Sequence, residues 1–200
     1  MVSSRVRIEP ANLRDCTYIG ANLREEDRRE IMCQLPDDVS GAAMAASVFA
    51  GAPEPWTRIA SLDGQPVAAF GFMPFTVPVW LAWAWGTRRL PRVAPAITRW
   101  CWEEEQQLLE LGVRRVEART VEGHHQAHRW LESLGCKRVC DLPDHGRNGE
   151  LFHLYAWTIG DGRPSQRHRY RTTNHVFQNA SSPEGADATS ASEPAVEGSG

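Results

Sequence analysis

The stretch 114–157, RRVEARTVEGHHQAHRWLESLGCKRVCDLPDHGRNGELFHLYAW, decides the fold of this chain. Val116, Ala118 and Thr120 alternate with charged residues, which is the two-residue period of a half-buried strand. From Ala127 to Leu134 the apolar residues recur at helical spacing, and Gly135 follows as a C-terminal helix cap. Two further strand-like runs, 137–142 and 151–158, can pair as neighbours. The stretch therefore predicts strand, short helix, strand, strand.

The preceding part of the chain supplies the other elements. Asp63-Gly64 separates two alternating runs, 56–62 and 65–72, which is a strong signal for a hairpin with a type I′ turn. A helix is expected over 93–111, closed by Gly112 and directing inward Val93, Ile97, Trp100, Leu108 and Leu111. The remaining expected elements are a strand at 5–9, a helix capped by Asn12 or Asp15 that carries Cys16, Ile19 and Leu23 on one face, a charged helical segment at 24–32, a helix at 41–50 and a strand at 79–86.

This order of elements predicts an α/β domain with a mixed sheet. The sheet should be mostly antiparallel, with parallel pairs only where a helix crosses over. Residues 1–159 are expected to form this domain. Residues 160–200 read as a basic linker followed by a Ser/Ala/Glu/Gly-rich tail, too poor in apolar groups to order, so disorder is expected there.

Composition excludes several classes of function. Net charge is −3, which does not indicate a general or specific nucleic-acid binder. No apolar run has the length of a membrane span, and the N-terminus lacks a signal-peptide core, so a cytoplasmic protein is expected. Five irregularly spaced cysteines favour free thiols in a reducing compartment over a disulfide framework.

Within this framework, the helix near the end of the domain resembles the corresponding helix of the GNAT (Gcn5-related N-acetyltransferase) proteins. Those proteins often carry Asn-x-x-Ala-x-x-x-Tyr-x-x-Leu-Gly-Phe there. The matching positions in this sequence are His124, Ala127, Leu131, Leu134, Gly135 and Cys136. The opening RIEPANLRDCTYI also resembles the GNAT start. The resemblance implies the acyl-CoA N-acyltransferase fold, with acetyl-CoA as a possible ligand and no metal.

The resemblance implies a pyrophosphate loop of the form Arg/Gln-x-x-Gly-x-Gly/Ala. The best superposition is Arg89-Leu90-Pro91-Arg92-Val93-Ala94, before a helix. Arg92 stands where glycine would let phosphate approach the backbone, and Pro91 removes one N–H donor. Guanidinium groups could compensate. The implied cofactor contacts are Trp83, Trp85, Arg88, Arg89, Arg92, Val93 and Ala94.

The catalytic positions also depart from the family pattern. Leu131 occupies the place of the usual proton-donating tyrosine and cannot donate a proton. The strand 79–86 carries no Asp or Glu to act as a base. His124, in the place of the family's Asn, is the remaining candidate acid or base, although a histidine on the surface at the start of a helix is the simpler interpretation.

Two other arrangements of residues are compatible with the sequence. His124 and His128 have the one-turn spacing of zinc ligands, with Cys136 and Cys140 downstream, but a polar helix face with buried thiols explains them more simply. Trp80, Trp83 and Trp85 could stack on bases. Since Trp83 and Trp85 share one face of the strand and Trp80 takes the other, burial of both faces is the simpler explanation.

A narrower resemblance concerns four segments: ANLREEDRREI, the glycine-containing hairpin, HRWLESLG and GRNGELFHLYAW. They are similar to the small GNAT-like proteins of T7-like tailed phages, the gene 13 product family, over roughly residues 5–158. This resemblance implies a role in virion morphogenesis with a degraded catalytic site, other virion or assembly proteins as partners, and a location in the host cytoplasm or the virion. The alternative is an acetyl-CoA-dependent N-acetyltransferase with a divergent pyrophosphate loop.

Overall fold

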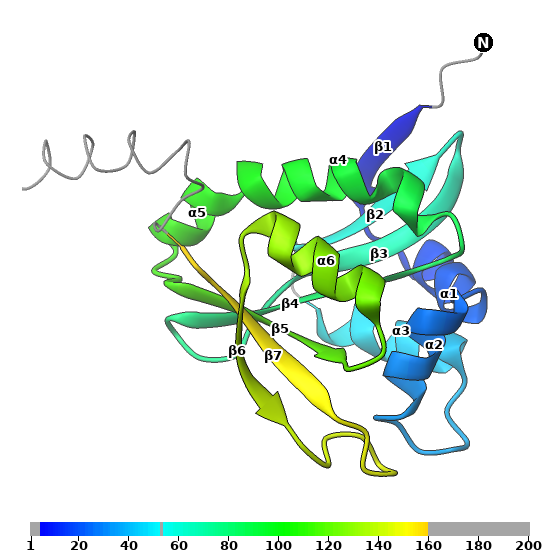
Figure 1. Ribbon diagram of the computed structural model, residues 1–200. Coiled ribbons are helices and arrows are strands. Elements are labelled where there is room, and N and C mark those ends of the chain that lie inside the picture. Colours follow the sequence, from blue (N-terminus) through cyan, green and yellow to red (C-terminus); the bar gives the residue numbers. More distant parts are fainter. Residues whose placement is uncertain (1–4, 53, 160–200) are drawn as a thin grey trace, which may run out of the picture. The chain divides into compact units, whose positions relative to one another are not determined.

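The computed structural model describes residues 5–52 and 54–159, so the tail expected at 160–200 lies outside the described residues. The elements follow the predicted order, except that two helices stand in place of the one expected over 93–111 (Figure 1). Their bounds are β1 Val6–Pro10, α1 Leu13–Ala21, α2 Glu25–Met32, α3 Gly41–Gly51, β2 Thr57–Leu62, β3 Gln65–Pro74, β4 Val79–Gly86, α4 Leu90–Glu103, α5 Glu105–Glu110, β5 Arg115–Val121, α6 His125–Leu134, β6 Lys137–Leu142 and β7 Phe152–Thr158.

The strands form one seven-stranded sheet in the order β1-β2-β3-β4-β5-β7-β6. Every neighbouring pair is antiparallel except β4 and β5, which the α4–α5 connection joins as a parallel pair. The prediction of a mostly antiparallel sheet with a parallel pair at a helical crossover is therefore confirmed.

Helices cover both faces of the sheet, each over its own apolar cluster. On one face α4 lies against β1, β2 and β3 and buries Val93, Ile97 and Trp100 in the first cluster. On the other face α1 and α3 enclose a second cluster that includes Ile19 and Trp85. Trp80 belongs to the first cluster and Trp83 packs with the second, so the predicted division of these tryptophans between two faces is correct. No helix within 5–52 and 54–159 is long and apolar enough to cross a membrane.

Local sequence signals are confirmed where the backbone needs them. The Asn12 side chain caps α1 by accepting from the N–H of Asp15 at 2.9 Å. Asp63 and Gly64 both have positive φ, as a type I′ turn requires. Gly135 ends α6 in the left-handed conformation, with φ of 97°.

The helix predicted over 93–111 differs in two respects. It begins earlier, at Leu90, because Pro91 in its first turn is preorganised for a helix start. It is also interrupted at Glu104, which ends α4 and precedes α5. Leu111 follows the last residue of α5 and is 52% exposed, so the expectation that it points inward is wrong. The other four inward positions are buried.

Candidate functional site

The strands β4 and β5 separate in the middle of the sheet. They pair only from Val79 and Arg115 to Leu81 and Glu117, and both strands continue past the last pair. The second halves of β4 and β5 thus leave a gap between them, while each keeps its other neighbour, β3 and β7 respectively.

The backbone of β4 presents hydrogen-bonding groups to this gap. The N–H of Gly86 donates to Asp27 Oδ2 at 2.7 Å, and the carbonyl of Gly86 accepts from the N–H of Arg24 at 2.9 Å. Both groups therefore point away from β3. Alternate residues of a strand point the same way, so the C=O of Ala82 and both the N–H and the C=O of Ala84 face the gap beyond the last pair, Leu81 and Glu117.

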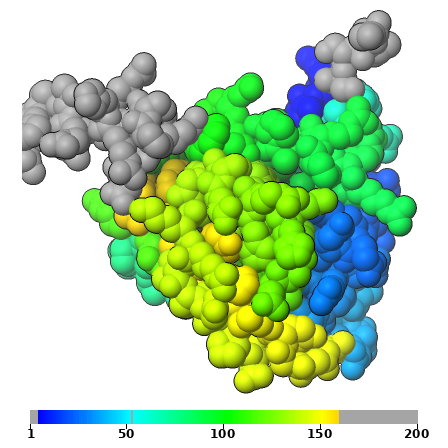
Figure 2. Space-filling model, in the orientation of Figure 1, coloured from blue at the N-terminus to red at the C-terminus, as the bar shows by residue number. Residues whose placement is uncertain are grey.

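A cavity of about 270 Å³ passes through the gap. Its wall on the α4 and α6 side is almost wholly apolar, whereas its wall on the α2 side carries most of the charged and polar groups. The surfaces of α4 and α6 lie next to each other on this side of the sheet (Figure 2). The first wall consists of Phe70, Phe72, Ala82, Ala84, Ile97, Trp100, Cys101, Ala118, Thr120, Ala127, Trp130, Leu131 and Leu134. The second consists of Glu30, Ile31, Gln34, Gly71, Met73, Leu81, Trp83, Trp85, Glu117 and Arg119.

Two carboxylates from α2 close the open end of the gap, one on each strand. Asp27 accepts from the N–H of Gly86 on β4, as described above. One helical turn later, Glu30 Oε2 accepts from the N–H of Val121 on β5 at 3.0 Å and from Thr120 Oγ1 at 2.5 Å. The i,i+3 spacing places both carboxylates on one face of α2, and this face spans the separation of the strands.

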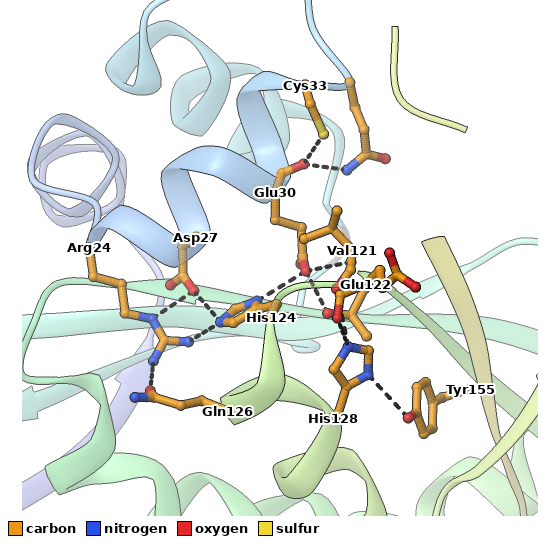
Figure 3. Close-up of polar contacts among 12 residues, drawn as sticks. Arg24, Asp27, Glu30, Cys33, Val121, Glu122, His124, Gln126, His128 and Tyr155 are labelled. Carbon is orange, nitrogen blue, oxygen red and sulfur yellow. Dashed lines mark hydrogen bonds and ion pairs between the residues drawn. The ribbon is translucent and has the colours of Figure 1, made fainter. Parts of the chain in front are cut away.

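His124 lies between these two carboxylates (Figure 3). Its Nδ1 is 3.0 Å from Glu30 Oε2, and its Nε2 is 3.2 Å from an Nη atom of Arg24. A guanidinium can only donate, so Nε2 accepts, and the proton sits on Nδ1, from where it is donated to Glu30. The His124 side chain is 4% exposed, so the expectation of a surface histidine is wrong. α2 covers it, and the position of α2 depends on tertiary packing.

The guanidinium of Arg24 joins the network to α6. Its Nε donates to Asp27 Oδ1 at 2.7 Å, and an Nη atom donates to Gln126 Oε1 at 3.0 Å. Burial raises the pKa of the Asp27 carboxyl, and Arg24 and the N–H of Gly86 act in the opposite direction. The arrangement fixes the start of α2 against both β4 and α6.

The loop that follows β4 uses most of its N–H groups internally. Thr87 donates to the carbonyl of Val67 at 2.8 Å, and Leu90 donates to the carbonyl of Thr87 at 2.9 Å. Arg92 donates to the carbonyl of Arg89 at 3.0 Å, and Pro91 has no N–H. Backbone donors for a phosphate are therefore scarce, in agreement with the departures from the glycine pattern.

The predicted cofactor contacts lie in two places. Trp83 and Trp85 line the cavity, stacked with ring centroids 5.8 Å apart. The other five predicted contacts lie just before α4 or in its first turns and do not line the cavity. Arg88 and Arg92 are exposed, and Arg89 forms an ion pair with Asp63 at 3.6 Å. Val93 is buried in the core, and Ala94 packs against that core.

The catalytic positions are likewise resolved. Leu131 lies in the apolar wall, where it adds no acid or base. His124 contacts Glu30 through its Nδ1, and within residues 5–52 and 54–159 it is not among the residues that line the cavity.

His128, which has the spacing of a zinc ligand relative to His124, hydrogen-bonds to Tyr155 Oη at 3.1 Å and to the carbonyl oxygens of Val121 and Glu122. The two histidines therefore have separate partners. Cys136 is partly buried and Cys140 is exposed. In the described part of the chain no group of three or more His, Cys, Asp and Glu residues is arranged to hold a metal ion.

Solved structures share this fold. The ribosomal-protein-S18-alanine N-acetyltransferase from Escherichia coli is 13% identical, with a TM-score of 0.56 over 78% of this chain and 94% of its own. A GNAT-family acetyltransferase from Bacillus anthracis is 14% identical, with a TM-score of 0.58 over 78% of this chain and 95% of its own. The Salmonella typhimurium protein yncA, solved with its cofactor acetyl-CoA, is 12% identical, with a TM-score of 0.53 over 77% of this chain and 94% of its own.

These similarities show that the chain has the GNAT acyltransferase fold. No protein-family model matches the sequence, and no curated protein does either.

The gap fits the thioester arm of an acyl-CoA better than the loop fits its phosphates. The arm is extended and carries two amides, so it can lie along β4 as an added strand and bond to Ala82 and Ala84. The indole Nε1 of Trp83, in the cavity wall, is buried without a hydrogen-bond partner among the described residues. For the phosphates the chain offers the exposed guanidinium groups of Arg88 and Arg92 in place of a backbone cradle.

Sequence reasoning missed the residues that form the gap and its polar end. Ala82 and Ala84 contribute only backbone groups, which leave no trace in residue type. Asp27 and Glu30 lie in a helix that carries charge on every side, REEDRREIM. Their i,i+3 spacing is the one signal that was present, and it does not distinguish a functional face from a solvated one.

Proposed function

We propose that this protein is an acetyl-CoA-dependent N-acetyltransferase with a divergent phosphate site. The observation that supports the proposal most directly is the separation of β4 and β5 after Leu81 and Glu117, with a cavity of about 270 Å³ through the gap. A strand edge with unused backbone groups beside an apolar wall suits the thioester arm. The cavity reaches both faces of the sheet, so a second substrate can approach the bound thioester from the other side.

The residues divide the work between the two ends of the ligand. Ala82 and Ala84 would hold the arm by strand-like hydrogen bonds. Arg88 and Arg92 would hold the phosphates by charge-assisted hydrogen bonds. When bound, acetyl-CoA supplies an acyl carbon activated as a thioester, which an amine can attack.

Calorimetric titration of the full chain with acetyl-CoA tests the proposal. Binding in the micromolar range is expected, equivalent to about 8 kcal/mol. The double substitution Arg88→Ala with Arg92→Ala should weaken binding by about 10- to 100-fold, since each guanidinium forms charge-assisted bonds. Arg99→Ala, an exposed arginine further along α4, is the matched control and should leave binding unchanged.

Pantetheine, which lacks the phosphates, separates the two ends of the site. Its affinity should be the same for the wild type and for the double variant. Absence of any heat with acetyl-CoA up to about 1 mM, about 4 kcal/mol, would exclude the proposed function.

The role in virion assembly implied by the narrower sequence resemblance stays a prediction. No feature of the fold, the site or the comparisons supports it, and the acetyltransferase proposal does not depend on it.

A further inference from the structure

The two walls of the cavity differ in chemistry, and this difference assigns a side to each substrate. On the α4 and α6 side Thr120 is the one hydroxyl among apolar groups, and Cys101 is the one thiol. The charged and amide side chains of the cavity wall all lie on the α2 side: Glu30, Gln34, Glu117 and Arg119. Of these, Gln34 and Arg119 are exposed at the rim of the cavity. A thioester arm suits the first wall, and a polar or charged acceptor suits the second.

Glu30 is a carboxylate of the cavity wall that three hydrogen bonds hold in place. Its Oε2 accepts three hydrogen bonds, from Thr120 Oγ1 at 2.5 Å, the N–H of Val121 at 3.0 Å and His124 Nδ1 at 3.0 Å. All three donors engage the same oxygen, and among the described residues none bonds to Oε1, which can accept from a further donor. The side chain is 17% exposed, so a ligand in the cavity can reach it.

Glu117, the other carboxylate in the wall, is already paired. Its Oε1 accepts from Arg115 Nε at 2.6 Å, and this ion pair balances its charge. The three donors to Glu30 include no lysine and no arginine side chain. Of the two carboxylates, Glu30 is therefore the one that an incoming cation would neutralise.

His124 fixes the orientation of Glu30 because its own orientation is fixed from behind. Arg24 donates to Nε2 at 3.2 Å, which keeps the proton on Nδ1 and directs it toward Glu30. Arg24 is in turn held by Asp27 and Gln126. The chain Asp27–Arg24–His124–Glu30 thus runs from the start of α2 to the cavity (Figure 3).

We propose that Glu30 binds and deprotonates the acceptor, that His124 is its positioning residue, and that the acceptor is a cationic primary or secondary amine entering from the α2 side. This inference rests on the proposed function. The ammonium gives one proton to Glu30 Oε1, and its nitrogen then bonds to the acyl carbon. The C–S bond breaks with its electron pair going to sulfur, and the second nitrogen proton ends on that sulfur. The products are the amide and the free thiol, and Glu30 returns its proton to water.

The test compares an amine with its isosteric alcohol, n-butylamine with n-butanol, as acceptors at saturating acetyl-CoA. Transfer is followed by release of the CoA thiol. The wild type should acylate n-butylamine at least about 100-fold faster than n-butanol, because only the amine is a cation that Glu30 can hold and deprotonate. Glu30→Gln should lower kcat/KM for n-butylamine by about 10- to 100-fold.

Glu25→Gln makes the same chemical change at an exposed position of α2 and is the matched control. It should leave kcat/KM within about 2-fold of the wild type, as expected for an exposed surface substitution. Binding supplies a second measurement that does not depend on turnover. In the CoA complex, NMR shifts caused by n-butylammonium should saturate for the wild type and for Glu25→Gln, and require about 10-fold more ligand for Glu30→Gln.

Two substitutions of His124 separate positioning from folding. His124→Leu can neither donate to Glu30 nor accept from Arg24, so kcat should fall about 10-fold while KM for acetyl-CoA is unchanged. His124→Asn places an amide N–H near the position of Nδ1, so it can still donate to Glu30 and should recover kcat to within about 3-fold. Equal loss of kcat in the two variants, or loss that follows only their melting temperatures, contradicts the positioning role.

The inference and the proposed function fail differently. If acetyl-CoA does not bind, the proposed function is wrong and the inference with it. If acetyl-CoA binds but Glu30→Gln transfers as fast as Glu25→Gln, or n-butanol is acylated as fast as n-butylamine, the inference alone is overturned.

Discussion

Removal of Asp27 should destabilise this protein more than the loss of any exposed carboxylate. The Asp27 and Arg24 side chains are 3% and 8% exposed, and Nε is 2.7 Å from Oδ1. The substitution Asp27→Ala leaves the buried guanidinium without its counter-charge and the N–H of Gly86 without its acceptor. Breaking a buried pair from one side costs about 3–5 kcal/mol, a large fraction of the 5–15 kcal/mol that stabilises a typical domain.

Urea denaturation measures this loss directly. With a urea dependence of about 2 kcal/mol/M, the midpoint should fall by about 1.5–2.5 M. Asp38→Ala, an exposed aspartate in the loop before α3, is the control and should change stability by less than about 0.5 kcal/mol.

A double variant separates the unpaired charge from the lost contact. Arg24→Met with Asp27→Asn removes both charges and keeps an oxygen that can accept from Gly86. It should be more stable than Asp27→Ala alone, although two residues have changed, because no buried charge remains unpaired. A double variant as unstable as Asp27→Ala, or a loss below about 1 kcal/mol for Asp27→Ala itself, would refute this reasoning.

Three further outcomes are expected. Burial raises the pKa of the Cys16 thiol to about 11 and of the Cys101 and Cys136 thiols to about 12. At pH 8 these thiols stay protonated, so they should react with a thiol reagent far more slowly than the exposed Cys140. Equal labelling rates in the folded protein would contradict this expectation. Gly20→Ala would place a Cβ 2.3 Å from the carbonyl oxygen of Gly41, which forces α1 away from α3, and should lower the free energy of unfolding by about 1–3 kcal/mol in thermal melts. Gly51→Ala is the control, because a Cβ there meets nothing within 4 Å, and it should be neutral or slightly stabilising. Asn12→Ala removes the cap of α1 and should cost about 1 kcal/mol, seen as a melting temperature lower by about 2–4 °C; an unchanged melting temperature would show that the cap contributes nothing.

The sequence by itself determined the order and type of the elements and several of their ends. Asn12, the Asp63-Gly64 turn and Gly135 act through backbone geometry within a few residues, so their effect can be read locally. The break at Glu104 escaped prediction because the apolar spacing continues through it to Leu108.

The residues of the site were decided by tertiary structure. Glu30 and His124 are 94 positions apart, and their contact exists only because α2 packs across the open end of β4 and β5. His124 is polar and precedes a helix, so its neighbours in sequence indicate exposure. It is buried because α2 covers it, and the sequence did not show against which part of the fold α2 packs. The gap between β4 and β5 has no residue signature at all, because it is made by backbone hydrogen bonds that two strands do not form with each other. Local patterns fix what each segment becomes, and only the packing of segments distant in the chain decides which groups meet.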